Sequence, residues 1–588
     1  MTDTRQSQPP QPPPRSTPPT AAASALPVVP PPTPAPPVEA APPVEAAPGA
    51  GGASTGGAAA LVPGPSGRFL ARAAFLTALL TAAGAVLGLL RDQTIAHFYG
   101  AGPDTDAFLV AWTVPEVSAT LLIEDAMALI LVPAFSLALA RRAVRPVSEP
   151  DPVRQLTRST LPRLFLALSA AAALLALAAP WAVAVLAPGL PETRLAVDCT
   201  RLTATSVFTY GLAGYFSAAL RAHGNFVAPA AIYVASNVGI IGTMLVVRDR
   251  GGVEVAAAGV GVGGVLMVLI QLPSLWRRLR EHRAGPSATP EPGPAVSRTA
   301  TVAPVALGLL APVIAFALSR QSQVLIERFL AAPLPAGAIS HLNYAQKVAQ
   351  IPMTLSLMLC TVTFPVVARA MAAGETDRAR RRVERDLALA AMIVLVGAAT
   401  IIACAPQFIE ILFQRGEFTA ADTAATAAVM RVYALGLLGH TLVGALVRCY
   451  FSAARPLWFP ALAMVLGLVL TTVAGALLVQ VWGVLGIAAA NALGITAAAA
   501  LILHGLSRHS MALDARFMLG GLAKLTAAAA ASTGAGWLVG TLVDSPVAGA
   551  VCACEVIAAV FLVIARALRA PEIDTVLRPV SRKLTHVR

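Results

Sequence analysis

Long apolar stretches alternate with short polar segments from residue 69 to residue 568. A helix needs about 20 apolar residues to cross the hydrocarbon core of a bilayer. The pattern therefore predicts an all-α polytopic membrane protein with about fourteen transmembrane helices. The expected segments are 69–90, 105–138, 161–187, 199–220, 226–248, 254–276, 301–330, 340–369, 387–413, 424–451, 456–480, 482–506, 518–542 and 546–568.

Three of these segments, 105–138, 301–330 and 340–369, carry charged residues and are longer than a straight span requires. We expect them to be bent. The glycines along 226–248, 254–276 and 456–480 indicate close packing between helices, because a glycine lets two backbones approach.

Basic residues gather in four segments between or after the apolar stretches. Loops rich in arginine and lysine mark the cytoplasmic side of a membrane protein. With fourteen spans, all four segments fall on one side, and an even number of spans predicts that both termini are cytoplasmic. The residues are Arg141, Arg142, Arg145, Arg154 and Arg158; Arg277, Arg278, Arg280 and Arg283; Arg378, Arg380, Arg381, Arg382 and Arg385; and Arg569, Arg578, Arg582, Lys583 and Arg588.

Composition narrows the class of protein. The chain has 588 residues, of which 56% are hydrophobic and 12% charged, whereas a soluble protein is about one quarter charged. The net charge of +13 lies in short loops, so we expect no nucleic-acid partner. The six cysteines fall in or beside apolar segments without zinc-type spacing, which predicts small buried side chains and no metal site.

Residues 1–66 have a different composition, dominated by Pro, Ala, Gly and Ser, with Ala-Pro-Pro-Val-Glu-Ala at 35–40 and again at 41–46. Such a segment cannot bury a core, so it predicts a disordered cytoplasmic tail. It lacks the basic and apolar regions of a signal peptide. An inert tail is the simpler interpretation, and a partner-docking tail is the alternative.

Motifs of catalysis are not found in the sequence. It contains no P-loop, no HExxH pair and no GxSxG elbow. We therefore expect neither an enzyme nor a motor that hydrolyses ATP, and no cofactor.

An internal repeat is suggested by two echoes. Ala179-Pro180 precedes Tyr210-Gly211-Leu212, as Ala405-Pro406 precedes Tyr433-Ala434-Leu435, at an offset of six predicted helices. An even offset predicts parallel repeats about an axis along the membrane normal, hence two six-helix lobes plus two extra C-terminal helices. The predicted domains are the tail 1–66, the lobes 67–285 and 286–510, the last two helices 511–570 and a basic cytoplasmic tail 571–588.

Several charged residues lie inside the apolar segments, where a charge is costly unless it faces a cavity or a partner. Glu124, Asp125 and Lys347 lie deep in their segments, which predicts a water-filled cavity around them. A cation there could hold a phosphate, which a lysine binds as a point charge. Glu116 precedes Glu124 by eight residues, so the two roughly share a helical face.

A second group of charges lies nearer the segment ends. We interpret Arg91, Glu327, Arg328 and Arg448 as interfacial side chains that extend to water. An ion pair between Arg91 and Asp106 is an alternative for the first of these.

Several stretches resemble the MurJ/MviN lipid II flippase family. They are Val86–Asp92, Phe98–Gly102, Thr105–Phe108, Asn343–Lys347 and, most strongly, Ile411–Thr419 followed by Asp422-Thr423. The resemblance spans about 68–510. It implies fourteen helices, two six-helix lobes and cytoplasmic termini.

The resemblance also implies a function. The family's members flip lipid II, the undecaprenyl-pyrophosphate-linked peptidoglycan precursor, across the cytoplasmic membrane by alternating access. The headgroup would enter a central cavity, and the lipid tail would lie in a groove lined by the last two helices. The resemblance implies that the cavity is lined by residues at the family's cavity positions or next to them. They are Arg91, Asp92, Asp106, Glu124, Asp125 and Lys347.

The chain departs from the family at several cavity positions. Ala119 and Thr120 stand where the family has an arginine pair, and Lys347 replaces an arginine. A more acidic cavity favours one alternative, an exporter of another substrate in the same superfamily. A second alternative, supported by the long Pro-rich tail, is a transport-inactive scaffold or regulator of cell-wall synthesis. The scaffold hypothesis would use the N-terminal tail to bind cell-wall synthesis proteins.

Overall fold

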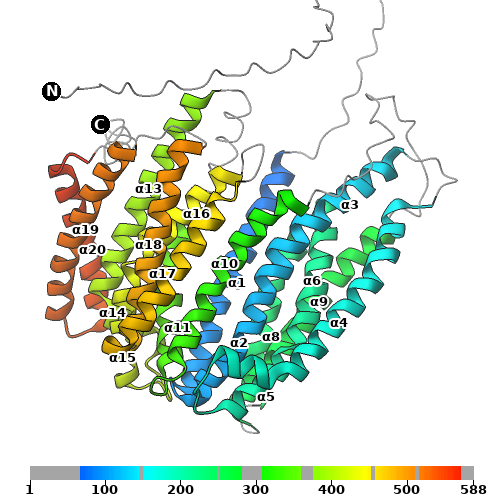
Figure 1. Ribbon diagram of the computed structural model, residues 1–588, viewed down its shortest axis with the longest axis horizontal. Coiled ribbons are helices and arrows are strands. Elements are labelled where there is room, and N and C mark those ends of the chain that lie inside the picture. Colours follow the sequence, from blue (N-terminus) through cyan, green and yellow to red (C-terminus); the bar gives the residue numbers. More distant parts are fainter. Residues whose placement is uncertain are drawn as a thin grey trace, which may run out of the picture. The chain divides into compact units, whose positions relative to one another are not determined.

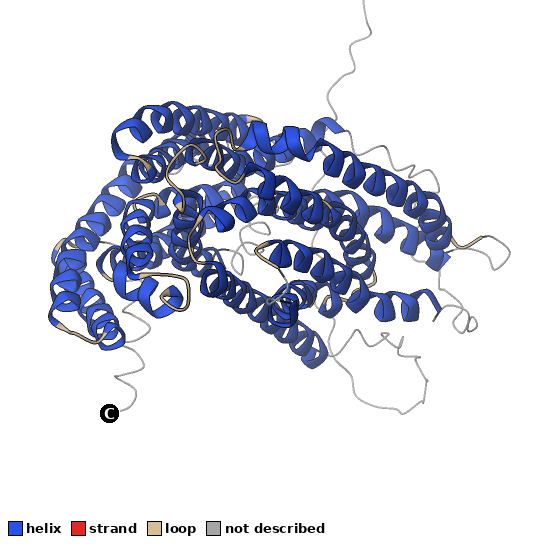
Figure 2. Cartoon of the chain, turned by 90° about the horizontal axis from the view of Figure 1, so that it is seen from below, coloured by secondary structure: helices blue, strands red, loops and turns tan. Residues whose placement is uncertain are grey.

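The computed structural model describes residues 67–144, 150–247, 251–280, 307–358, 360, 375–451, 457–509 and 515–570. Helices make up nearly all of these residues, and no strand occurs among them (Figures 1 and 2). The predicted tails 1–66 and 571–588 lie outside the described residues, as do the loops between the described ranges.

We call α1–α9 the N-terminal half and α10–α20 the C-terminal half. The helices of the N-terminal half are α1 (Gly67–Tyr99), α2 (Pro103–Ser118), the π-helix η1 (Ala119–Asp125), α3 (Ala126–Val144), α4 (Pro152–Leu186), α5 (Thr193–Thr203), α6 (Thr205–Ala222), α7 (Val227–Ala230), α8 (Ile232–Val247) and α9 (Glu254–Arg280).

The helices of the C-terminal half are α10 (Leu307–Ala331), α11 (Ala338–Ala349), α13 (Thr376–Ala403), α14 (Ala405–Phe413), α15 (Ala420–Ala434), α16 (Leu437–Phe451), α17 (Phe459–Trp482), α18 (Val484–His509), α19 (Ala515–Leu542) and α20 (Pro546–Ala567).

Nine helices in the described part of the chain are long and apolar enough to cross a membrane. The pair α15–α16, bent by 47°, makes a tenth if it counts as one span. The prediction of an all-α polytopic membrane protein is confirmed. The count of fourteen spans stays a prediction.

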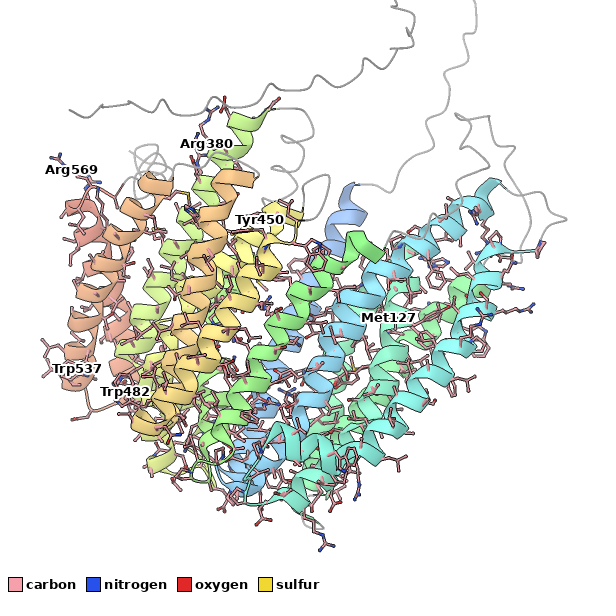
Figure 3. The ribbon with its side chains drawn as sticks, viewed as in Figure 1. Met127, Arg380, Tyr450, Trp482, Trp537 and Arg569 are labelled. Atoms are coloured by element: carbon pink, nitrogen blue, oxygen red, sulfur yellow. The ribbon has the colours of Figure 1, made fainter. Side chains whose placement is uncertain are left out.

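The surface agrees with a lipid solvent. Many large apolar side chains on the surface are exposed. Trp181 is 80% exposed and Val246 is 84% exposed. In water this surface would drive aggregation, whereas hydrocarbon solvates it. Arg380 and Arg569 lie toward one end of the helices, and Trp482 and Trp537 toward the other (Figure 3). Basic residues on one side and interfacial tryptophans follow the usual pattern of membrane proteins.

The segment predicted at 105–138 is interrupted by the π-helix η1, which separates α2 from α3. The helix α6 packs against η1 so closely that a Cβ on Gly214 would collide with the Leu122 carbonyl oxygen. A π-helical turn inside an α-helix widens the backbone and often marks a functional site. Because η1 alters the helical period, the predicted shared face of Glu116 and Glu124 does not follow from their spacing.

The segment predicted at 340–369 is also interrupted. The helix α11 ends at Ala349, and the chain is helical again from 351 to 358 after a turn at Gln350. Pro352 lies in this second piece and lacks the N–H that would continue the helical hydrogen bonds. The predicted segment therefore contains two helical pieces, α11 and 351–358, in place of one continuous helix.

Glycine contacts hold two helix pairs close together. A Cβ on Gly239 in α8 would lie 2.6 Å from the Cα of Gly263 in α9. In the second pair, a Cβ on Gly467 in α17 would lie 2.7 Å from the carbonyl oxygen of Gly494 in α18. These contacts confirm the close packing predicted from the glycines.

The last two helices, α19 and α20, pack against each other and against α13. In Figure 1 they lie at the outer edge of the C-terminal half. Gln407 on α14 donates its side-chain N–H to the carbonyl oxygen of Gly540 at 3.0 Å, which fixes the far end of α19. The predicted domain boundaries are not tested by these contacts and stay predictions.

Candidate functional site

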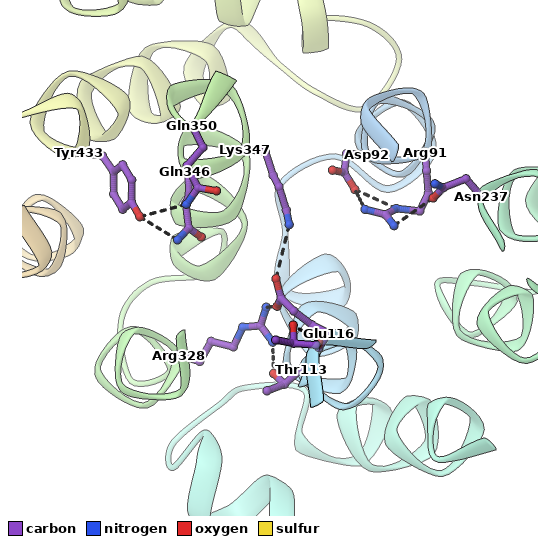
Figure 4. Close-up of polar contacts among 11 residues, drawn as sticks. Arg91, Asp92, Thr113, Glu116, Asn237, Arg328, Gln346, Lys347, Gln350 and Tyr433 are labelled. Carbon is purple, nitrogen blue, oxygen red and sulfur yellow. Dashed lines mark hydrogen bonds and ion pairs between the residues drawn. The ribbon is translucent and has the colours of Figure 1, made fainter. Parts of the chain in front are cut away.

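Glu116 on α2 lies at the centre of a charged cluster between the two halves (Figure 4). Its Oε2 pairs with Nη2 of Arg328 on α10 at 3.0 Å, and its Oε1 with Nζ of Lys347 on α11 at 3.5 Å. Arg328 also donates from Nη1 to the Thr113 hydroxyl. We call Glu116, Arg328 and Lys347 the Glu116 cluster. Its carboxylate comes from the N-terminal half and both cations from the C-terminal half.

The interpretation of Arg328 and Glu327 as interfacial side chains is wrong, because both are buried. The reason is tertiary: partners for these polar groups stand on helices far away in sequence. Arg328 reaches Glu116 on α2, and Glu327 accepts a hydrogen bond from the side-chain amide of Asn491 on α18. Consecutive residues on a helix point about 100° apart, so α10 presents its two charges to different neighbours. The side chain of Arg448 lies outside the described residues.

From Glu327, a chain of buried and half-buried polar side chains runs through the C-terminal half. Asn491 contacts Nε2 of His440 through its Oδ1 at 3.2 Å. The His440 ring stacks on Tyr433, with ring centroids 5.8 Å apart. The Tyr433 hydroxyl in turn accepts a hydrogen bond of 2.8 Å from the Gln346 amide on α11. This chain gives Glu327 a hydrogen-bonded environment inside the helices.

A small cavity of about 10 Å³, with room for about one water molecule, lies between α10 and α11, beside both features. Glu327, Arg328, Asn343 and Gln346 contribute its polar lining. Lys347, on the same helix as Gln346, keeps 32% of its side chain exposed. The Glu116 cluster can therefore be reached by a polar group from outside the packed core.

Arg91 and Asp92 form an ion pair on α1, beside the Glu116 cluster (Figure 4). Arg91 Nη2 lies 2.7 Å from Asp92 Oδ1 and its Nη1 donates to Asn237 Oδ1 at 3.2 Å. The guanidinium carbon sits 4.3 Å from the centre of the Trp112 ring, a cation–π contact. Arg91 also acts electrostatically on Glu116. Arg91 keeps only 11% of its side chain exposed and is paired within the protein, so its interpretation as an interfacial side chain is wrong.

Asp106 does not pair with Arg91, so that alternative is wrong as well. Its carboxylate accepts hydrogen bonds from the Gly337 N–H at 2.7 Å, the Ser340 N–H at 2.8 Å and the Ser340 hydroxyl at 2.6 Å. These groups form the N-terminus of α11, where the helix dipole and the free N–H groups attract a negative charge. Asp106 therefore joins α2 to α11.

Backbone contacts close the same end of the molecule. Glu417 donates its N–H to the carbonyl oxygen of His97 at 3.1 Å. Gly100 and Gly416 have positive φ angles, and a Cβ on Gly100 would lie 2.7 Å from the Glu417 carbonyl oxygen. We call these contacts, with those of Asp106, the closed junction. It joins the ends of α1 and α2 to α11 and to the loop between α14 and α15.

Glu124 stands apart from these groups. It lies at the end of η1, is exposed, and accepts a hydrogen bond of 2.7 Å from the Tyr233 hydroxyl through Oε1. The side chain of Asp125 lies outside the described residues. Of the six predicted site residues, the structure places Arg91, Asp92 and Lys347 around Glu116, whereas Asp106 belongs to the closed junction. Whether these residues bind a substrate stays a prediction.

Sequence reasoning did not select Glu116 and Arg328 as site residues. The sequence marks Glu116 only by its spacing from Glu124, and it predicts that Arg328 lies at the interface. The sequence nevertheless contains a signal. Glu116 and Arg328 each lie inside a long apolar segment, and each has residues of opposite charge on other apolar segments. The pairing itself follows only from the way α2 and α10 pack.

The comparisons with known proteins agree on one family. The profile of the lipid II flippase MurJ family matches residues 95–550. The chain belongs to this family. A probable lipid II flippase MurJ of Rhizobium meliloti is 26% identical over 398 residues, covering 66% of this chain and 71% of the relative. The lipid II flippase MurJ of Burkholderia cenocepacia is 28% identical over 391 residues, covering 64% and 73%.

Solved structures show the same fold for this MurJ family member. A lipid II flippase MurJ in an inward closed conformation superposes with a TM-score of 0.66 at 18% identity, covering 83% of this chain and 98% of that one. A MATE family multidrug transporter of the MOP superfamily, in an inward-facing conformation, gives 0.56 at 14% identity, covering 74% and 98%. Both likenesses concern the fold alone.

Proposed function

We propose that the protein is a lipid II flippase, which moves the undecaprenyl-pyrophosphate-linked peptidoglycan precursor across the cytoplasmic membrane by alternating access of its two halves. Membership of the MurJ family over residues 95–550 carries this proposal. The geometry supports it, because cations of the C-terminal half meet the N-terminal half at the Glu116 cluster. A diphosphate headgroup is recognised by such positive side chains through charge-assisted hydrogen bonds.

Alternating access needs one end of the boundary between the halves to close while the other opens. The closed junction supplies one such closed end, through Asp106 and through the backbone contact between Glu417 and His97. These bonds are short-range and few, so they can break and form again during a cycle. We infer that the junction faces away from the cytoplasm, with both termini cytoplasmic, because Arg380 and Arg569 lie toward the opposite end (Figure 3).

We also propose that α19 and α20 line the path of the polyprenyl tail. Both helices expose large apolar side chains, among them Trp537, Leu542 and Val551. A polyprenyl chain gains no free energy by moving from lipid hydrocarbon to this apolar protein surface. The surface can still guide the chain while the headgroup moves. The N-terminal tail as a docking site for cell-wall synthesis proteins remains a proposal about residues outside the described range.

The test is rescue of bacteria depleted of their own lipid II flippase. The wild-type chain is expected to restore survival, and Lys347→Ala and Asp106→Ala are expected to lose it at equal membrane expression. Asp104→Asn serves as the control, because Asp104 is exposed at the start of α2, two residues before the buried Asp106. Failure of the well-expressed wild type, together with no lipid II transport in proteoliposomes, would contradict the proposal.

A further inference from the structure

Glu116 uses both of its carboxylate oxygens on cations of the opposite half. Oε2 engages Arg328 and Oε1 engages Lys347. Two positive side chains and one negative side chain leave the Glu116 cluster with one net positive charge. In this conformation the carboxylate stands where an anionic ligand of these two cations would have to bind.

We propose that Glu116 is an internal counter-anion, which a diphosphate group displaces from Arg328 and Lys347, and that this competition selects substrates by their charge. The proposal rests on the proposed function, since it concerns how the same site takes a lipid diphosphate. A carboxylate offers one negative charge and two oxygens. A diphosphate offers more charge and more oxygens, so it can satisfy both cations at once. A monophosphate carries about −1.5 to −2 charges on three oxygens at a single phosphorus, so it satisfies both cations less well than a diphosphate does.

The exposures of the three side chains give the order of displacement. Lys347 is 32% exposed and Glu116 25%, whereas Arg328 is only 5% exposed and is also held by Thr113. An incoming anion therefore meets Lys347 first. The longer contact, 3.5 Å from Lys347 to Glu116 against 3.0 Å from Arg328, is also the weaker of the two. Arg328 stays fixed and receives the ligand after Glu116 has left.

Displacement also changes the boundary between the halves. Both ion pairs of Glu116 join α2 to α10 or α11. When a diphosphate takes the two cations, these links between the halves are lost and the ligand stays with the C-terminal half. Binding of a diphosphate thus destabilises the conformation in which Glu116 pairs with Arg328 and Lys347. The ligand therefore interacts differently with two conformations of the protein, as alternating access requires.

The experiment uses the full chain in lipid nanodiscs and isothermal titration calorimetry. The probes are inorganic pyrophosphate, undecaprenyl diphosphate and undecaprenyl monophosphate. Glu116→Gln keeps the size of the side chain and removes its charge, so we expect diphosphate binding to tighten by about tenfold, as for the loss of one charge-assisted competitor. The preference for diphosphate over monophosphate should fall in the same variant.

The matched control is Glu375→Gln, which removes an equal charge from an exposed ion pair with Arg378 on α13. We expect its diphosphate affinity to equal that of the wild type. Lys347→Gln is the second variant, expected to bind diphosphate about tenfold more weakly, and it decides the question if Glu116→Gln does not fold. Folding is checked by monodispersity in size-exclusion chromatography.

The outcomes separate the two proposals. Unchanged or weaker diphosphate binding by folded Glu116→Gln overturns the counter-anion, even if the wild type flips lipid II. Tighter binding in a protein whose wild type does not flip lipid II supports the counter-anion and contradicts the flippase. Tightening for undecaprenyl diphosphate assigns the site to a lipid headgroup, whereas tightening for inorganic pyrophosphate alone assigns it to a soluble diphosphate. If Glu116→Gln does not fold, wild-type affinity in Lys347→Gln overturns the proposal.

Discussion

Charged side chains in this protein find their partners on distant helices, and each pairing joins two particular elements. Asp106 binds the N-terminus of α11, Glu116 binds α10 and α11, and Glu327 binds α18. A buried charge without such a partner is strongly destabilising. The packing between these elements therefore depends on single contacts whose removal can be measured.

Asp106→Ala should weaken the closed junction. The substitution removes the acceptor of three hydrogen bonds and leaves the Gly337 and Ser340 N–H groups without it. A hydrogen bond to a charged group contributes about 1.5–3 kcal/mol. We therefore expect the free energy of unfolding to fall by about this amount. Thermal unfolding in detergent would show it as a lower midpoint than for Asp104→Asn. An unchanged midpoint would show that the cap contributes nothing.

Asn491→Leu should destabilise the C-terminal half. It removes the amide that donates to buried Glu327 and that contacts His440. An unsatisfied buried polar group costs about 1–3 kcal/mol, and more for a charge. Thr472→Val is the control, because Thr472 is exposed and bonds only the Leu468 carbonyl of its own helix. The same thermal assay measures both, and equal midpoints would argue against a structural role for the amide.

At the scale of helices, glycines set how closely the elements pack. The pair α8–α9 crosses where Gly263 meets the backbone of Ser236, and a Cβ on Gly263 would lie 2.6 Å from the Ser236 carbonyl oxygen. Backbone cannot yield as a flexible side chain can. The crossing therefore depends on the missing side chain.

Gly263→Ala should force α8 and α9 apart. We expect a cost of about 1–3 kcal/mol, the usual range for overpacking. Gly242→Ala on α8 is the matched control, because its Cβ would meet no atom within 4 Å. Its stability should be unchanged or slightly higher, since alanine favours the helix. If Gly263→Ala unfolds at the temperature of Gly242→Ala, the close packing does not contribute to stability.

At the scale of the whole molecule, the closed junction and the Glu116 cluster both connect the two halves. The junction uses backbone at Gly416, where φ is +64° and a Cβ would collide with the His97 carbonyl oxygen. The cluster uses side chains alone. A cycle of alternating access has to break the first without unfolding either half.

Gly416→Ala should shift the protein away from the conformation with the closed junction. Gly224→Ala isolates this effect, because Gly224 also has positive φ, +72°, but open space around it. Both substitutions cost about 1–2 kcal/mol, because alanine disfavours the left-handed backbone. Only the Cβ of Gly416→Ala would also collide with a residue of the opposite half. Cross-linking of His97→Cys to Glu417→Cys, two residues joined by a backbone hydrogen bond, should fall in Gly416→Ala when the native cysteines are replaced. Equal cross-linking in both would show that the junction tolerates the side chain.

The sequence by itself determined the class of protein, because the length of apolar stretches and the glycine spacing are local properties. It also marked Arg91, Asp92 and Asp106, because the family motifs contain them, and Lys347, because it is a cation deep in an apolar segment. It could not determine their partners. Glu116 lies 212 residues from Arg328 and 231 from Lys347, and Asp106 lies 231 from Gly337. Only the packing of α2 against α10 and α11 brings these charges within reach. Tertiary structure therefore decided that Arg328 is a buried cation and that Glu116 occupies the site between the halves.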